Sequence, residues 1–387
     1  GHYLASATGM RVLENGGNAI DAGVAAGICL NVLLPEMCGF GGVAPIMVYL
    51  AEEDRVISLN GVGPWPAKAS VDYFMTQHGG VIPSGVARVV VPVAAGAWLT
   101  ALEMWGTKSF AEVVGGALGL ARDGFPLHFT GAAGMPDLVN ASRDWESSLV
   151  VFAPKGRPIG FRERFVQSDL ANTFEKLINA EKSRSSLSRE AGIRAAREEF
   201  YSGGIGEAIT GFVQSEGGLL DSSDLANFEI EIEDTVTGSF GEYEVYACGP
   251  WSQGPVLVET LQILRPDDFR SLAHNSAEYI HLVTEALKLA FADRDAFVSD
   301  PKFVDVPIAA LGSLEYAESR RSQIDPDRAT PEMPRYGDPW KFENRSQPDS
   351  WNYQHPATLP VAAELDTSYA CAVDRWGNAF SATPSDG

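Results

Sequence analysis

The segment Asp366-Thr367-Ser368-Tyr369 contains the residue of this sequence whose type and place best suit catalysis. A threonine hydroxyl is a weak nucleophile at neutral pH and needs a base beside it. If the peptide bond before Thr367 breaks, the freed α-amino group can be that base, because its reference pKa is near ~8 and it reaches its own hydroxyl. This chemistry requires a threonine at the start of a strand that follows an exposed loop. Many threonines have such a position, so position alone does not identify a nucleophile.

The elements expected around Thr367 meet this requirement. Side chains alternate between two faces from Thr367 to Asp374, which predicts a strand, and residues 375–378 predict a turn into a second strand, Ala379 to Thr383. Upstream, seven prolines lie between Asp325 and Pro360. They predict a long irregular connection over residues 325–366, which would expose the bond before Thr367 to cleavage.

Glycines organise the start of the chain. Gly16-Gly17 predicts the end of one helix, and Asn18 can cap a second. In this second helix Gly23 and Gly27 leave a face of small side chains, so we expect it to be buried and closely packed.

The rest of the chain predicts both strands and helices. Residues 46–50 and 56–59 are expected to form an antiparallel hairpin after a glycine loop. The charged run from Glu181 to Glu199 is interpreted as one solvated helix face. An amphipathic helix is expected to begin at Asn275, with Glu278 completing a capping box.

Composition excludes several classes of protein. The chain has 387 residues, 45% of them hydrophobic, and a formal net charge of -22. Its sequence pI is near 4.6, so nucleic acid and anionic membrane surfaces would repel it. No apolar run is long enough to predict a membrane span. We therefore expect a globular protein with no nucleic-acid or membrane partner.

Cysteines and histidines give no sign of a metal or a disulfide framework. The four cysteines are widely spaced among small or apolar neighbours, which favours buried free thiols: Cys29, Cys38, Cys248 and Cys371. The six histidines show no HExxH motif or short pairing. We predict no metal and no cofactor.

Three motifs, in order along nearly the whole chain, resemble those of gamma-glutamyltranspeptidases. They are Gly16-Gly17-Asn18-Ala19-Ile20-Asp21-Ala22 with the helix after it, the loop Gly39 to Gly42 before a strand, and Asp366-Thr367 with Val373-Asp374 and Gly377-Asn378-Ala379. Weaker matches lie between them, among them Pro66-Ala67-Lys68-Ala69, Ala121-Arg122-Asp123-Gly124 and Ala292-Asp293-Arg294. Together these motifs are far more specific than any one of them.

The resemblance implies an α+β fold, the four-layer αββα sandwich of N-terminal-nucleophile hydrolases. It implies a precursor that cuts itself between Asp366 and Thr367, with residues 1–366 belonging to the large subunit and 367–387 starting the small one. The two pieces stay together. Thr367 then attacks an amide carbonyl, forms an acyl-enzyme, and passes the acyl group to water or to an amine. Ser385 stands where the family places a hydroxyl that hydrogen-bonds the nucleophile, although it can also be an ordinary turn serine.

Departures from the family concern the substrate. Gamma-glutamyl compounds such as glutathione are the family's usual substrates, and an arginine that follows the Pro66–Ala69 match usually grips their α-carboxylate. This chain has Val71 at that position, and Gly387 where those enzymes have an asparagine. The departures resemble a branch that includes acylases and small-amide hydrolases such as oxamate amidohydrolase. Trp251 and Gln253 are candidates for the substrate pocket, and Trp251 can equally be a packing residue.

Other interpretations stay open or are disfavoured. A phosphate-binding loop at Gly39–Gly42 is disfavoured because the loop precedes a strand and no GKS/T follows. A serine hydrolase would need a G-x-S-x-G elbow, which the sequence lacks. A non-catalytic member of the family, acting as a binding or structural module, stays open.

The sequence leaves the setting of the protein undecided. Its last strands would lack partners in a sheet, so we expect the natural protein to continue beyond Gly387. The resemblance implies that the continuation carries the glycine-pair oxyanion donors, so this chain alone is expected to be inactive. A homo-oligomer is possible. The compartment is undetermined, with the cytoplasm favoured over the periplasm or secretion.

Overall fold

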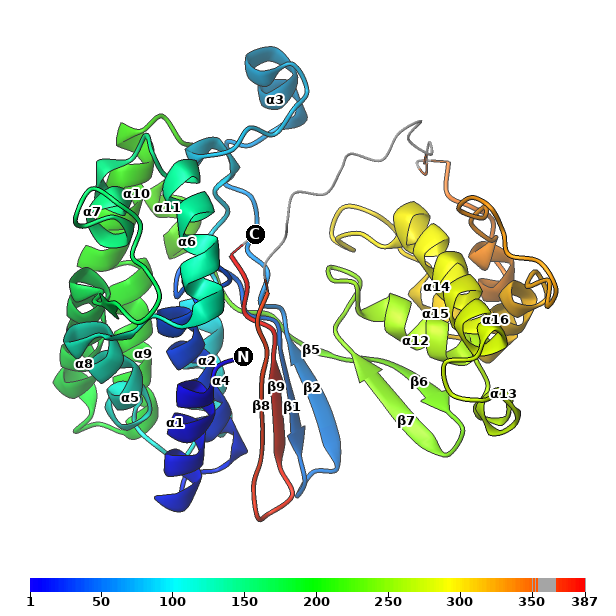
Figure 1. Ribbon diagram of the computed structural model, residues 1–387, viewed down its shortest axis with the longest axis horizontal. Coiled ribbons are helices and arrows are strands. Elements are labelled where there is room, and N and C mark those ends of the chain that lie inside the picture. Colours follow the sequence, from blue (N-terminus) through cyan, green and yellow to red (C-terminus); the bar gives the residue numbers. More distant parts are fainter. Residues whose placement is uncertain (350, 352, 354–366, 387) are drawn as a thin grey trace. The chain divides into compact units, whose positions relative to one another are not determined.

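The chain forms two compact units in the computed structural model, which describes residues 1–349, 351, 353 and 367–386, without the side chains of 266–268. Unit 1 comprises residues 1–55, 61–231 and the described residues from 367 on. Unit 2 comprises residues 56–60 and the described residues of 232–353. Each unit combines helices with a small sheet (Figure 1). The expected α+β class is confirmed.

Three neighbouring antiparallel strands, called here the unit 1 sheet, belong to unit 1. The middle strand, β9 (Ala379–Ala382), pairs with β1 (Ile46–Leu50) on one side and β8 (Ala370–Val373) on the other. Phe380 is therefore opposite both Val48 and Ala372. The two strands predicted after Thr367 are confirmed, but β8 begins at Ala370, three residues later than expected.

Helix α2 (Ala19–Leu33) is buried along its whole length. A Cβ atom on Gly23 would overlap the ring of Phe380 in β9, and one on Gly27 would lie 2.5 Å from the ring of Trp98 in α4 (Ala94–Trp105). Both glycines are needed because aromatic rings occupy the space that a side chain would fill. The predicted close packing of this helix is confirmed.

The N-terminus of α2 is tied to the connection that leads into α5 (Phe110–Asp123). Asn18 caps α2 by accepting the Asp21 N–H at 3.0 Å, and Asp21 accepts the Asn18 N–H at 2.8 Å. Asp21 is fully buried and also accepts the N–H groups of Thr107 and Lys108 and the Thr107 hydroxyl. One carboxylate thus orients the starts of two helices.

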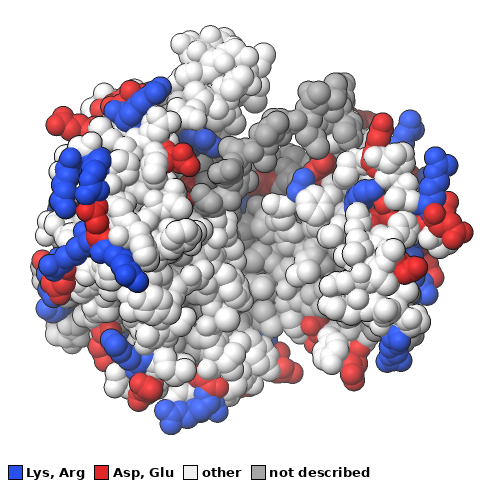
Figure 2. Space-filling view, viewed as in Figure 1, with Lys and Arg blue, Asp and Glu red and all other residues white. Residues whose placement is uncertain are grey.

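The charged run from Glu181 to Glu199 does not form one solvated helix, so that interpretation was wrong. It spans the end of α8 (Ser168–Arg184) and most of α9 (Arg189–Tyr201). Glu181 is buried and accepts the N–H groups of Phe110 and Ala111 at the start of α5. On the face shown in Figure 2, acidic and basic side chains intersperse over the helical layer of unit 1.

The remaining elements of unit 1 are α1 (Tyr3–Glu14), α3 (Val71–His78), η1 (Val86–Arg88), β3 (Phe125–Pro126), α6 (Phe129–Ala141), α7 (Glu146–Phe152), β4 (Arg164–Phe165), α10 (Gly204–Ser215) and α11 (Ser222–Ala226).

Unit 2 contains two antiparallel strand pairs with helices. β2 (Arg55–Leu59) pairs with β5 (Ile232–Asp234), and β6 (Val236–Phe240) pairs with β7 (Tyr243–Ala247). The predicted strands 46–50 and 56–59 are both confirmed. The helices are α12 (Gly254–Ile263), α13 (Pro266–Ser271), α14 (Ala277–Phe297), α15 (Ile308–Leu311), α16 (Leu314–Arg321) and η2 (Pro339–Glu343).

Helix α14 begins slightly later than expected. Its cap is Ser276, which accepts the Tyr279 N–H, whereas Asn275 has a left-handed backbone with φ of 58°. In the described ranges, no helix has both the length and the apolar character needed to cross a membrane.

Buried charges join the helices of unit 2. Asp293 of α14, fully buried, accepts the Tyr316 hydroxyl at 2.8 Å and the Gly337 N–H at 2.7 Å, and lies 2.9 Å from the Arg320 guanidinium. Glu259 of α12 is also buried. Burial, reinforced by the negative charge of Asp293, raises the pKa of Glu259 well above its usual value. The Glu259 carboxyl therefore holds its proton to a higher pH than an exposed glutamate does.

We expect Glu259→Gln to flatten the pH dependence of stability. Glu259 ionises near pH ~4.3 in the unfolded chain but at a higher pH in the folded one. Native stability should therefore fall as pH rises from the unfolded pKa toward the folded pKa, by up to ~1.4 kcal/mol per pH unit. Glutamine has nearly the same shape but does not titrate. The unfolding free energy of the variant should therefore increase relative to that of the native protein as pH rises. Urea unfolding between about pH 5.5 and 8.5 measures the difference. Parallel curves for the two proteins would contradict the assignment.

Candidate functional site

Thr367 and Ser385 meet at the end of the unit 1 sheet. Thr367 is exposed and forms an isolated antiparallel bridge with Ser385, whose side chain is buried. The Thr367 hydroxyl donates to Ser385 Oγ at 3.3 Å. The next residue is fixed as well, because the Ser368 N–H donates to the Pro384 carbonyl at 3.0 Å. The structure thus brings together the predicted nucleophile and its predicted supporting hydroxyl.

A glycine loop supports Ser385 from the other side. Ser385 and Val43 exchange two backbone hydrogen bonds, of 2.9 and 3.0 Å. A Cβ atom on Gly42 would overlap the Ser385 carbonyl oxygen and lie 2.8 Å from the Asp386 carboxylate. The Gly42 carbonyl also accepts the N–H groups of Val93 and Ala94 at the start of α4. The sequence marked this loop as a motif but did not reveal that it packs against Ser385.

The turn between β8 and β9 carries two positioning residues that sequence reasoning left without a role. Asp374 accepts the N–H groups of Trp376 and Asn378 within the turn, and the Ala19 N–H at the start of α2. Burial opposes ionisation of Asp374, but hydrogen bonds led by the one from the Asn378 side chain outweigh it and lower its pKa. Asn378 in turn accepts the Ala51 N–H after β1. The Val373-Asp374 and Gly377-Asn378 motifs therefore lock the Thr367 strand to α2 and β1.

In the part of the chain that the structure describes, no carboxylate or imidazole hydrogen-bonds the Thr367 hydroxyl. Among the described residues, Ser385 is the side chain recorded in a hydrogen bond with the Thr367 hydroxyl, and a serine hydroxyl does not act as a base at neutral pH. An α-amino group released at Thr367 would supply one on the same residue. The arrangement therefore suits a nucleophile that becomes active only after the chain is cut before it.

The two buried cysteines of unit 1, Cys29 and Cys38, do not offer a competing nucleophile. Burial raises the pKa of Cys29 and of Cys38 to about 12, so both remain thiols. The expectation of buried thiols holds for these two and is wrong for Cys371, which is exposed on β8. Within the described ranges, no group of three or more histidine, cysteine or acidic side chains could hold a metal ion.

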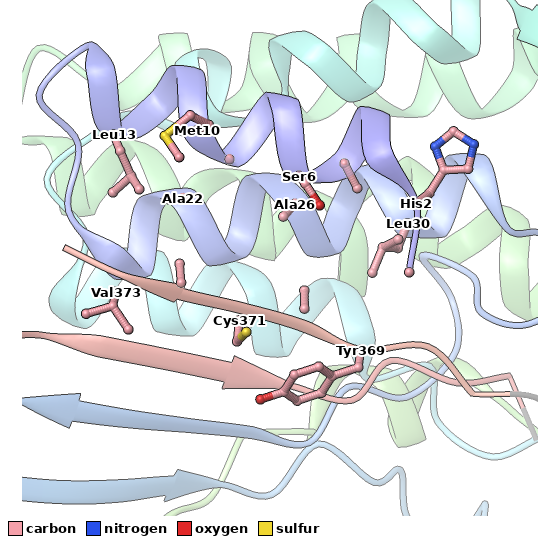
Figure 3. Close-up of a pocket in the computed structure, with 15 residues that line it drawn as sticks. His2, Ser6, Met10, Leu13, Ala22, Ala26, Leu30, Tyr369, Cys371 and Val373 are labelled. Atoms are coloured by element: carbon pink, nitrogen blue, oxygen red, sulfur yellow. The ribbon is translucent and has the colours of Figure 1, made fainter.

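A pocket of about 360 Å³ lies along β8 but does not include the predicted nucleophile. Figure 3 shows its walls: Met10 and Leu13 from α1, Ala22, Ala26 and Leu30 from α2, Cys371 and Val373 from β8, and Tyr369 just before that strand. Neither Thr367 nor Ser385 lines it. We therefore do not assign it to the reaction.

Trp251 and Gln253 lie in unit 2, on the turn before α12. The Trp251 ring N–H donates to the Glu233 carboxylate, and Gln253 accepts from Arg294 at 2.8 Å. Both residues line a hollow of about 660 Å³, called here the unit 2 pocket, with Pro250, Ser252, Arg294, Asp295, Val298, Ser299 and Asp300. The two candidates thus share one pocket, and their contact with substrate stays a prediction.

Val71 is the first residue of α3 and is 77% exposed. Ser70 caps this helix by accepting the Tyr73 N–H at 3.1 Å. A neutral side chain therefore occupies the place expected for the carboxylate-binding arginine. Asp366 and Gly387 lie outside the described residues.

Comparison with known proteins gives a consistent result. A family model described as Gamma-glutamyltranspeptidase matches residues 5–386. The chain is 32% identical over 395 residues to the glutathione hydrolase proenzyme of Bacillus subtilis (strain 168), covering 99% of this chain and 62% of the relative. It is 33% identical over 400 residues to the acylase ACY 1 proenzyme of Pseudomonas sp. (strain SE83), covering 99% and 63%.

A solved structure supports the fold. The crystal structure of Helicobacter pylori gamma-glutamyltranspeptidase matches with a TM-score of 0.78 and 29% identity, over 85% of this chain and 92% of that one. This similarity confirms the predicted αββα fold class of N-terminal-nucleophile hydrolases. The chain spans less than two thirds of the length of the two curated relatives.

We expect Gly42→Ala to destabilise the site and Gly41→Ala to leave it intact. The added methyl at residue 42 must displace the Ser385 backbone, which should cost about 1–3 kcal/mol of unfolding free energy. At residue 41 the nearest atom would be Pro92 Cβ at 3.9 Å, an ordinary contact, so the change should stay within ~0.5 kcal/mol. Urea unfolding compares the two variants. Equal stability of both would show that the loop does not support Ser385.

Proposed function

Because this chain belongs to the gamma-glutamyltranspeptidase family, we propose that the protein is a precursor that cuts itself between Asp366 and Thr367. Thr367 then acts as the nucleophile of an amidohydrolase and acyltransferase. The observation that carries this proposal is the placement of an exposed Thr367 against the Ser385 hydroxyl at 3.3 Å. The relatives named above are proenzymes, which agrees with a precursor.

Self-cleavage follows from the chemistry of the threonine hydroxyl. Thr367 Oγ1 adds to the carbonyl carbon of the preceding residue, the peptide C–N bond breaks, and the nitrogen takes the hydroxyl proton. Water then hydrolyses the ester that has formed, leaving a free α-amino group on Thr367. In later turnovers this amine accepts the hydroxyl proton as Thr367 attacks an amide, and it returns the proton to the leaving amine.

The two pieces should remain together after cleavage. β9 pairs with β1, which precedes the cut, and Ser385 pairs with Val43. Asp374 additionally holds the Ala19 N–H at 3.0 Å. Backbone hydrogen bonds between residues on both sides of the cut do not depend on the bond at 366–367, so we propose a complex of large and small subunits from one precursor.

The substrate is proposed to be a small-molecule amide, with water or an amine as acceptor. Gamma-glutamyl compounds are the substrates that the family suggests first, and glutathione hydrolase is the name of a relative. Val71 argues against them because it cannot grip an α-carboxylate. An acylase is therefore the second candidate, favoured by Val71 and by the similarity to an acylase proenzyme. Trp251 and Gln253 are the residues proposed to contact the substrate.

Thr367→Ala in the full-length precursor should abolish both self-cleavage and amide turnover, because it removes the only oxygen that attacks. Thr367→Ser keeps a hydroxyl and should retain both at a reduced rate. Thr383→Ala, an exposed threonine at the end of β9, serves as the matched control and should cleave normally. Gel electrophoresis and an anilide assay measure the two activities. Normal cleavage in the Thr367→Ala protein would overturn the proposal, and a precursor that never cleaves would favour a non-catalytic module.

The donor preference tests the meaning of Val71. Two donors are compared: gamma-glutamyl-p-nitroanilide and 4-aminobutyryl-p-nitroanilide, which lacks the α-carboxylate. An arginine that binds the α-carboxylate would raise kcat/KM for the first donor about 10–100-fold above that for the second. Without such an arginine, we expect the kcat/KM values of the native protein for the two donors to differ by less than about threefold. Val71→Arg should raise the ratio and Val71→Leu should not. A native ratio above about 30 would contradict this interpretation of Val71.

A further inference from the structure

The unit 2 pocket has a rigid wall made by the turn before α12. Ser252 Oγ donates to the Gly249 carbonyl at 2.9 Å and accepts the Gly254 N–H at 3.1 Å. The Glu233 carboxylate fixes the Trp251 indole through its ring N–H. A Cβ atom on Gly249 would lie 2.8 Å from that ring nitrogen, so only glycine leaves the indole in place. The aromatic wall is therefore preorganised.

Arg294 of α14 lines the same hollow and has hydrogen-bonding capacity left over. Its guanidinium stacks on the Phe291 ring at 4.4 Å, and Asp295 Oδ1 accepts from Nε at 2.9 Å and from Nη2 at 2.6 Å. Gln253 accepts from Nη1 at 2.8 Å. A guanidinium has five N–H donors, and three are used by these residues. Among the residues that the structure describes, no partner is recorded for the other two, one on each terminal nitrogen.

A donor left on each terminal nitrogen is what an end-on, two-bond contact with a carboxylate requires. The charges in the pocket restrict the ligand further. Asp295 already neutralises Arg294, and Asp300 adds a second, exposed carboxylate to the lining. A plain anion would be repelled by Asp300, whereas a ligand that also carries an ammonium group would be attracted by it and by the Trp251 ring.

We propose that unit 2 carries a binding site for a free α-amino acid, with its carboxylate on Arg294 and its ammonium group at Asp300 beside Trp251. The proposal adds Arg294 and Asp300 to the two residues that the proposed function names. It does not require that Thr367 reacts. A purely structural tether between the turn and α14 accounts for the Gln253 and Asp295 contacts, whereas the two remaining N–H groups lie beside a hollow of about 660 Å³ and are available to a ligand.

Binding is best measured by calorimetry on the full-length Thr367→Ala protein, which cannot turn over its ligand. The probe is L-methionine, whose neutral side chain leaves the head group to determine the result. L-methioninamide lacks the carboxylate and N-acetyl-L-methionine lacks the ammonium group. We expect saturable binding of L-methionine and about tenfold or greater weakening for each analogue.

Variants assign the two halves of the head group. Arg294→Lys keeps the charge but cannot make two parallel hydrogen bonds to a carboxylate. It should weaken the binding of L-methionine about tenfold. Asp300→Asn should weaken L-methionine but leave N-acetyl-L-methionine unchanged, and it tests the proposal even if the Arg294 variant fails to fold. Asp327→Asn, an exposed aspartate elsewhere in unit 2, is the matched control and should bind like the parent.

Three results would overturn the site: no saturable binding, equal affinity for all three ligands, or undiminished binding in both the Arg294 and Asp300 variants. Retained binding in a protein whose Thr367 proves inert would remove the proposed function and leave the site standing. Absence of binding in a protein whose Thr367 cleaves the chain and turns over an amide would overturn the site and leave the proposed function standing.

Discussion

The pairing of Ser385 with Val43 on one side and Thr367 on the other is the constraint on which the candidate site depends. Two backbone hydrogen bonds fix Ser385 to Val43, and the isolated bridge to Thr367 then places both hydroxyls together. The pairing is possible only because Gly42 has no side chain where the Ser385 carbonyl lies. The proposed nucleophile, at an exposed chain position, is thereby held by Ser385 and by a loop far from it in sequence.

Two carboxylates, the fully buried Asp21 and the half-buried Asp374, extend this constraint to the helical layer. Asp374 holds both its own turn and the start of α2, and Asp21 holds the start of α2 to the segment before α5. Each carboxylate accepts several backbone N–H groups at once, which orients the segments that donate to it. Residues on both sides of the 366–367 bond therefore share one hydrogen-bond network, and a cut there leaves it intact.

Local signals explain which predictions succeeded. The buried helix with Gly23 and Gly27, the Asn18 cap and the strands after Thr367 follow from periodicity and capping, and all are confirmed. The Glu181–Glu199 run misled because charge patterning cannot reveal that Glu181 caps α5 across the fold. Likewise the roles of Gly42, Asp21 and Asp374 depend on partners distant in sequence, which spacing alone does not identify. The Arg294 contact with Gln253 depends on a turn 41 residues away along the chain.

The account rests on one chemical event, the release of the Thr367 α-amino group. Intact-mass spectrometry of the purified full-length precursor, with sequencing of any new N-terminus, tests it most directly. The account predicts two chains whose masses sum to that of the precursor plus one water, the smaller beginning at Thr367. A single uncut chain that persists under conditions where the protein is folded, or a cut at another bond, would contradict it.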